Sequence, residues 1–189
     1  KSLKSKNNII YTYDETQALC CARTIPSVDF PPNLTQIADW AFKYCKRLKE
    51  LKLPDNVETL GFQAFYGCDG IMGTVHLPKN LKTIGIGAFD GCNNVAGFDL
   101  SKCNELSSIG GRAFANCMKI KEVHLPEKLE EIVGNAFSGC TELATITVAS
   151  ANATFTVKDN TVYDKGGKKL LCSARAITSF NFPADITEI

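Results

Sequence analysis

The chain has 189 residues, of which 44% are hydrophobic and 22% charged, and its formal net charge is +1. This near-neutral balance excludes nucleic acid as the main partner, because phosphate binding needs a surplus of basic residues. No apolar run approaches the ~20 residues that a membrane helix needs, and the start lacks the apolar core of a signal peptide. We therefore expect no direct membrane insertion in this segment.

Residues 1–29 are predicted to form a β-hairpin insert that leads into a repeat array. The evidence is a second copy, because residues 11–37 match residues 163–189 without gaps at an offset of 152. In the later copy, Gly166 and Gly167 separate two strand-like runs, 161–163 and 169–172. A Gly-Gly pair between two such runs is typical of a hairpin.

An Ala-Phe pair followed three residues later by Cys recurs through residues 30–150. The spacings between the Phe residues are 23, 24, 25 and 23: Phe42, Phe65, Phe89, Phe114 and Phe137. Aliphatic residues precede each Phe by five and by eight positions. A fixed period of this length predicts five tandem units of a stacked repeat fold.

Each repeat contains a short run with period 2, such as Leu51-Lys52-Leu53, which predicts a strand that Pro54 ends. The stretch between the aliphatic residues and Ala-Phe predicts a corner followed by a short helical or 3₁₀ turn. One unit cannot bury its own apolar face. Stacking the units aligns the strands in a parallel sheet and predicts a solenoid.

Residues 151–181 are predicted to be the second β-hairpin insert, and residues 182–189 the start of a further repeat. The sequence begins without Met and ends at Ile189 inside a recognisable unit. We therefore expect the chain to be one continuous solenoid domain from a longer protein.

The motif Leu-Pro-x-x-Leu-x-x-Ile-Gly-x-x-Ala-Phe-x-x-Cys, from Leu77 to Cys92, resembles the BspA-like leucine-rich repeat family. The resemblance covers residues 10–189. It implies an α/β solenoid, a right-handed superhelix of short parallel strands and short helical or 3₁₀ turns, with β-hairpin inserts. Members are typically surface or secreted proteins of host-associated bacteria and some parasitic protists, and their known roles are usually in adhesion. The family brings no catalytic motif.

Nine cysteines are many for this length. Five occupy one phase of the repeat and are predicted to be buried free thiols: Cys45, Cys68, Cys92, Cys117 and Cys140. No Cys-x-x-Cys pair is present, which removes the usual signature of a zinc or redox site. Of the other cysteines, we expect Cys20, Cys21 and Cys103 to be exposed or paired.

The outward positions of the predicted sheet form the candidate protein-binding face. They are Asp29, Glu50, Lys52, Thr74, His76, Asp99, Glu122, His124, Thr147 and Asn181. His76 and His124 lie two repeats apart, roughly 10 Å, so solvated positions are favoured over a metal site. Two glycosylation sequons, at Asn33 and Asn152, have meaning only in a eukaryotic secretory pathway.

These features predict a non-enzymatic repeat protein at the cell surface or outside the cell. We expect it to be a monomer that adheres to host or neighbouring-cell proteins, with no cofactor, no metal and no catalytic residue. An intracellular scaffold or regulatory module is the alternative, because many free cysteines fit a reducing compartment.

Overall fold

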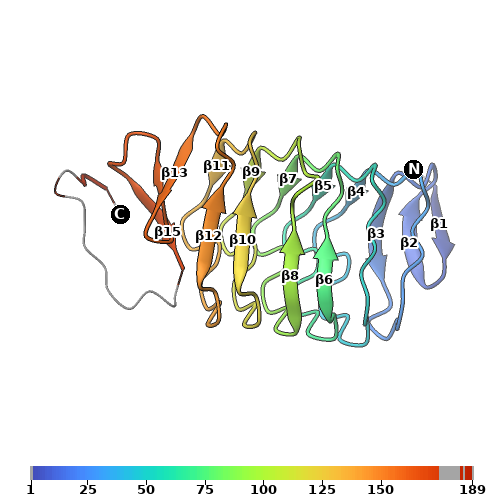
Figure 1. Cartoon of the computed structure of the whole chain (residues 1–189). Coiled ribbons are helices and arrows are strands. Elements are labelled where there is room, and N and C mark those ends of the chain that lie inside the picture. The colour runs from blue at the N-terminus through green and yellow to red at the C-terminus, as the bar shows by residue number, and fades with distance from the viewer. Residues whose placement is uncertain (1, 175–183, 185, 189) are drawn as a thin grey trace.

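The computed structural model describes residues 2–174, 184 and 186–188. Strands and turns stack into an elongated solenoid, with the strands of the first residues at one end and those of residues 155–173 at the other (Figure 1). The solenoid and its parallel strands are confirmed. In the described residues, no helix long and apolar enough to cross a membrane is found.

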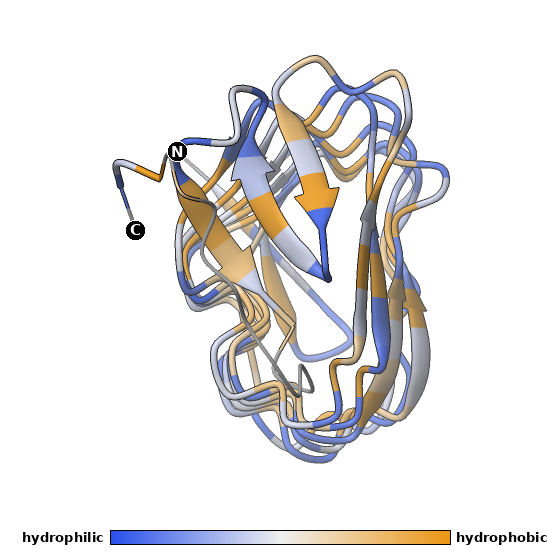
Figure 2. Cartoon of the chain, turned by 60° about the vertical axis from the view of Figure 1, so that its left-hand side comes forward, coloured by the Kyte–Doolittle hydropathy of each residue, from blue (hydrophilic) through white to orange (hydrophobic). Residues whose placement is uncertain are grey.

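Two layers of parallel strands face each other across the core. One layer has five strands of two residues each: β4 (Gln36–Ile37), β5 (Thr59–Leu60), β7 (Thr83–Ile84), β9 (Ser108–Ile109) and β11 (Glu131–Ile132). The other layer has β6 (Gly73–His76), β8 (Val95–Asp99), β10 (Glu122–Leu125) and β12 (Thr145–Val148). Figure 2 shows successive coils lying behind one another in this two-sided outline.

The residues of the first layer were predicted to form a corner, and this prediction is wrong because they form parallel strands. The expected strand at Leu51-Lys52-Leu53 is also wrong, because residues 49–54 contain no strand. Leu51 is nevertheless buried and Lys52 exposed, so the inward and outward directions predicted for them are correct.

The Phe residues of the repeat form a continuous buried stack. Neighbouring rings from Phe42 to Phe137 have centroids 5.1, 5.3, 5.9 and 5.4 Å apart, with interplanar angles of 19°, 6°, 4° and 5°. Each ring is at most 5% exposed. Since each unit adds one ring to the stack, the repeat supplies a core that no single unit could build.

The five in-phase cysteines are buried, as predicted. In four coils the thiol lies against the Phe carbonyl of the coil before: Cys68 Sγ donates to Phe42 O at 2.9 Å, Cys92 to Phe65 at 3.3 Å, Cys117 to Phe89 at 3.2 Å and Cys140 to Phe114 at 3.0 Å. The prediction for Cys103 is wrong. Its side chain is fully buried, and its thiol donates to Pro78 O at 3.4 Å.

The helical or 3₁₀ turns expected after each corner are wrong, because the described residues contain no helix. Residues with positive φ recur every fourth position there, as at Trp40 (56°) and Tyr44 (62°), and interrupt any right-handed helix. Alternate amides also bond between coils: Phe42 N donates to Ala64 O at 2.8 Å, and Tyr44 N to Tyr66 O at 2.7 Å. These amides are therefore not available for a helix.

The two inserts are three-stranded meanders rather than simple hairpins. The first has β1 (Leu3–Lys6), β2 (Ile9–Thr12) and β3 (Gln17–Cys21), and the second has β13 (Phe155–Lys158), β14 (Thr161–Asp164) and β15 (Leu170–Ser173). Their first turns are tight two-residue turns with positive φ at both residues, Asn7-Asn8 and Asp159-Asn160. The two meanders repeat the same design at the predicted offset.

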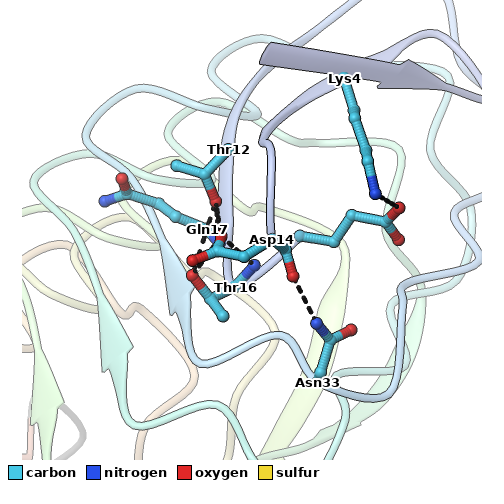
Figure 3. A network of polar contacts seen from close by, with 7 residues as sticks. Lys4, Thr12, Asp14, Thr16, Gln17 and Asn33 are labelled. Carbon is cyan, nitrogen blue, oxygen red and sulfur yellow. Dashed lines mark hydrogen bonds and ion pairs between the residues drawn. The ribbon is translucent and has the colours of Figure 1, made fainter. Parts of the chain in front are cut away.

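The turn between β2 and β3 is held by one carboxylate (Figure 3). Asp14 Oδ1 accepts hydrogen bonds from Thr12 Oγ1 at 2.6 Å and Thr16 Oγ1 at 2.8 Å, while Asn33 Nδ2 donates to Asp14 O at 2.6 Å. The Thr12 and Thr16 bonds lower the pKa of Asp14 to about 2. This network ties the first meander to the first coil.

Candidate protein-binding face

The face made by β6, β8, β10 and β12 carries the predicted binding residues. Along β10, Glu122 and His124 are exposed while Val123 is 3% exposed, as a strand with one solvated side requires. The strand pairing aligns His76 with Asp99 and His124 with Thr147. Outward residues from successive coils therefore form rows across the face.

The structure brings together only part of the predicted set. Thr74 and His76 lie on β6, Asp99 on β8, and the remaining strand residues on β10 and β12: Glu122, His124 and Thr147. Asp29, Glu50 and Lys52 are exposed but lie outside any strand, and Asn181 lies outside the described residues. Lys52 Nζ pairs with Glu50 Oε1 at 2.9 Å, so these two side chains share a face.

Two polar contacts join neighbouring side chains within one row of this face. His76 Nδ1 lies 2.8 Å from Asp99 Oδ2, and His124 Nδ1 lies 2.8 Å from Thr147 Oγ1. Asp99 Oδ1 also accepts a hydrogen bond from Ser101 N at 2.9 Å. The hydrogen bonds from Ser101, and then the one from His76, lower the pKa of Asp99 to about 2. Asp99 is therefore an anion near neutral pH.

The face is divided between β8 and β10. β6 pairs with β8, and β10 pairs with β12, but these are two separate sheets, and no backbone hydrogen bond joins β8 to β10 within this described part of the chain. A groove of about 650 Å³ lies over the division. Its rim includes Thr74, Gly97, Asp99, Ser101, Glu122 and His124.

Two local features coincide with this division. Phe98 occupies the inward position that Val75 and Val123 hold in neighbouring coils, and its ring lies 4.8 Å from that of Phe89 and 4.6 Å from that of Phe114. The Phe89–Phe114 step is the widest of the stack, at 5.9 Å. The larger ring therefore sits where the two sheets part.

Gly97 leaves the solvent side of the groove open, because it has no side chain where neighbouring coils have Thr74 and Glu122. A Cβ at Gly97 would meet only the Thr74 side chain, at 3.6 Å, which is ordinary contact. Gly97, Ser101 and Lys121 were not among the site residues predicted from the sequence. The available signal was the two extra residues near Cys103, together with a Gly in an otherwise polar column.

The groove has an apolar floor and a polar rim. Phe98, Leu100 and Val123 line it and are only 6%, 3% and 3% exposed, whereas the rim carries both charge signs. No group of three or more His, Cys, Asp or Glu side chains that could hold a metal ion is found in the part of the chain that the structure describes. The arrangement suits non-covalent binding of a mixed apolar and polar segment.

The sequence matches the family described as BspA type Leucine rich repeat region, with six copies, over residues 15–144 and 69–189. A solved leucine rich repeat protein of T. pallidum is 28% identical, with a TM-score of 0.66, over 77% of this chain and 71% of that one. A sequence search of curated proteins found no match.

Two further solved structures share the fold at lower identity. The pneumococcal vaccine antigen PcpA is 18% identical, with a TM-score of 0.68, over 98% of this chain and 60% of that one. A leucine rich cell surface protein of Faecalibacterium prausnitzii is 20% identical, with a TM-score of 0.52, over 100% of this chain and 66% of that one. This chain thus spans less than two thirds of each. With the family match over most of its length, the chain belongs to the BspA-type leucine-rich repeat family.

Proposed function

We propose that the chain is a non-enzymatic protein-binding module, displayed at the cell surface or secreted, that adheres to host or neighbouring-cell proteins. The groove between β8 and β10 carries this proposal, because it is a hollow of about 650 Å³ in a sheet face of a solenoid. Solenoid proteins use such extended faces to bind proteins. The description of the F. prausnitzii structure as a cell surface protein supports the location.

The groove fits a protruding loop whose tip carries one large apolar side chain. The floor of Phe98, Leu100 and Val123 offers apolar contact, and the rim of Asp99, Glu122 and His124 offers hydrogen bonds. A buried apolar anchor inside a polar rim is the arrangement that concentrates binding energy at protein interfaces. The predicted residues Asp29, Glu50 and Lys52 do not line the groove.

The test is a binding assay on immobilised extracellular-matrix and serum proteins with the wild-type chain and Gly97→Glu. Glu122 stands at the equivalent outward position of β10, so a Glu side chain suits a strand backbone at Gly97 while it fills the groove. We expect affinity for the captured protein to fall at least tenfold in Gly97→Glu and to stay unchanged in the control Arg47→Ala, which is exposed and does not line the groove. Absence of any bound matrix or serum protein contradicts adhesion, and full binding by Gly97→Glu contradicts the groove.

An intracellular scaffold is the second candidate, and the free thiols favour it. All nine cysteines are unpaired in the structure, including the exposed Cys20, and free thiols persist best in a reducing compartment. Limited proteolysis of intact source cells, followed by detection of this chain, separates the two locations. Protection of the chain in intact cells and cleavage after lysis would assign it to the cell interior.

A further inference from the structure

The column of buried thiols changes its bonding at its first member. From Cys68 onward, each thiol donates to a Phe carbonyl one coil earlier, as Cys68 does to Phe42 O at 2.9 Å. Cys45 belongs to the first of these coils, so no Phe of the repeat precedes it. Its Sγ lies instead 3.0 Å from Sγ of Cys21, at the end of β3. The contact between the two sulfurs therefore lies at the N-terminal end of the column of thiols.

The backbone holds these two positions side by side. Cys21 N donates to Ala41 O at 3.0 Å, and Ala38 N donates to Ala18 O at 2.9 Å. β3 also pairs in parallel with β4 in the same large sheet. Because both thiols sit on bonded neighbouring segments, a bond between them requires side-chain rotation and little movement of the chain.

We propose that Cys21 and Cys45 form a site of oxidative modification, at which a small anionic disulfide converts the two thiols into one intramolecular disulfide. This site is separate from the proposed binding groove between β8 and β10. It lies between the first meander and the first coil.

A cavity of about 500 Å³ gives access to the pair. It is lined by Cys20, Cys21, Arg23, Trp40, Ala41 and Lys43. Arg23 and Lys43 make this entrance cationic, so a negatively charged disulfide is attracted to it. Cys21 is partly exposed whereas Cys45 is fully buried, and the first attack therefore falls to Cys21.

The surroundings favour a shared proton between the two sulfurs. The hydrogen bond from Cys21, the neighbouring Cys68 thiol and the charge of Arg23 lower the pKa of Cys45 to about 4. The hydrogen bond to Cys45, and then burial, raise the pKa of Cys21. The pair therefore holds one negative charge and one proton, and movement of that proton from Cys21 to Cys45 across the 3.0 Å contact makes Cys21 the thiolate, which is the form that attacks disulfides.

The exchange balances in two steps. Cys21 transfers its proton to Cys45 and its thiolate attacks one sulfur of the external disulfide, so that a mixed disulfide forms and one small thiolate leaves. Cys45 then attacks Cys21 Sγ, the mixed disulfide breaks, and the second small thiolate leaves. The one proton that the pair holds passes from Cys45 to one released thiolate, the other released thiolate takes its proton from water, and the external disulfide is reduced to two thiols.

The second meander lacks this pair. At the offset of 152, Cys172 corresponds to Cys20, and Ser173 stands where the first meander has Cys21. The thiol pairing is therefore a property of the first meander and not of the meander design itself. The second meander, with Ser173 in place of a cysteine, is a comparison within the same chain.

The test treats the purified full chain with oxidised glutathione and maps the cross-links by mass spectrometry without reduction. Trypsin places Cys21 in the peptide 7–23 and Cys45 in the peptide 44–46, so the bond joins two separate peptides. We expect this link in wild type, in Cys20→Ser and in Cys92→Ser, and its loss in Cys21→Ser and Cys45→Ser. We also expect the unfolding midpoint to rise by roughly 5–10 °C on oxidation.

Charge at the entrance gives a readout that protein stability does not affect. Lys43→Gln, which removes a charge that lines the entrance, should slow oxidation by glutathione disulfide severalfold and leave oxidation by the uncharged hydroxyethyl disulfide unchanged. A bond between Cys20 and Cys21, glutathione retained as a mixed disulfide in wild type, or no cross-link at all overturns the proposal.

Discussion

The ring of Phe65 lies parallel to the ring of Phe89, with 5.3 Å between their centroids and 6° between their planes. Phe89 also stacks on Phe114 on its other side, and its own side chain is fully buried. Removing this ring leaves a cavity in the middle of the stack that a regular array of coils cannot close. The repeat therefore makes each Phe depend on its two neighbours.

Phe89→Ala should lower the free energy of unfolding by about 3–5 kcal/mol, the usual cost of deleting a buried aromatic side chain. Urea unfolding followed by circular dichroism measures it. Lys52→Ala, at an exposed position, is the control and should change the free energy by less than about 0.5 kcal/mol. Equal effects of the two variants would contradict the buried Phe stack.

Gly85→Ala should destabilise the fold through the close approach of two coils. A Cβ on Gly85 would lie 2.7 Å from the backbone C and O of Gly61, closer than real Cβ contacts come. We expect a loss of about 1–3 kcal/mol, typical of overpacking. Gly97→Ala is the matched control, because its nearest atom is 3.6 Å away, and its stability should equal that of wild type in thermal unfolding.

The repeat period predicted which residues are buried, but it did not predict the backbone conformation of the corners. The Ala-Phe and Cys positions recur at one phase, so their burial follows directly from the stacking. The corner residues have the same periodicity whether they form a helical turn or a strand. Positive φ at Trp40 and Tyr44, together with the bonds between coils, selects strands and tight turns, and residue type alone does not reveal this.

For the candidate site, the sequence predicted only which side chains point outward from the strands. Outward exposure of His76, Glu122 and His124 follows from the period of 2 along each strand. The division between β8 and β10 coincides with the large ring of Phe98 in the core, and this arrangement is visible only once the inward side chains are packed. The burial of Cys103 could not be predicted for the same reason, because its contact with Pro78 depends on how a two-residue insertion folds inward.

Asn152→Ala should be strongly destabilising, although Asn152 lies in a glycosylation sequon. Its side chain is 2% exposed, Nδ2 lies within 3.0 Å of the carbonyls of Pro126, Glu127 and Leu129, and Oδ1 accepts from the amides of Thr154 and Phe155. Loss of these bonds leaves buried groups unpaired, and we expect a cost of about 2–3 kcal/mol. Urea unfolding measures this cost.

Asn33→Ala is the control for that sequon position. Asn33 is exposed and its Nδ2 makes one hydrogen bond, to Asp14 O at 2.6 Å, so the loss should stay below about 1 kcal/mol. After expression in a eukaryotic secretory host, mass spectrometry should find no glycan on Asn152 of the folded chain, because its side chain is buried, whereas Asn33 is exposed and can accept one. Glycan on Asn152 of the folded chain would contradict its buried role.

Asp99 should make stability depend on acid pH in a defined window. The hydrogen bonds from Ser101 and His76 lower its pKa to about 2, against about 3.9 in an unfolded chain. A lowered carboxyl pKa contributes stability above the unfolded value, and that contribution disappears as pH falls through the folded value. The difference in unfolding free energy between wild type and Asp99→Asn should therefore be constant above pH about 5 and shrink towards pH about 2. Urea unfolding of both proteins at each pH measures it, and the carboxylates of Asp14 and Asp164 cancel because both proteins contain them. A difference that stays constant down to pH about 2, or grows there, would show that Asp99 is not held as an anion by these contacts.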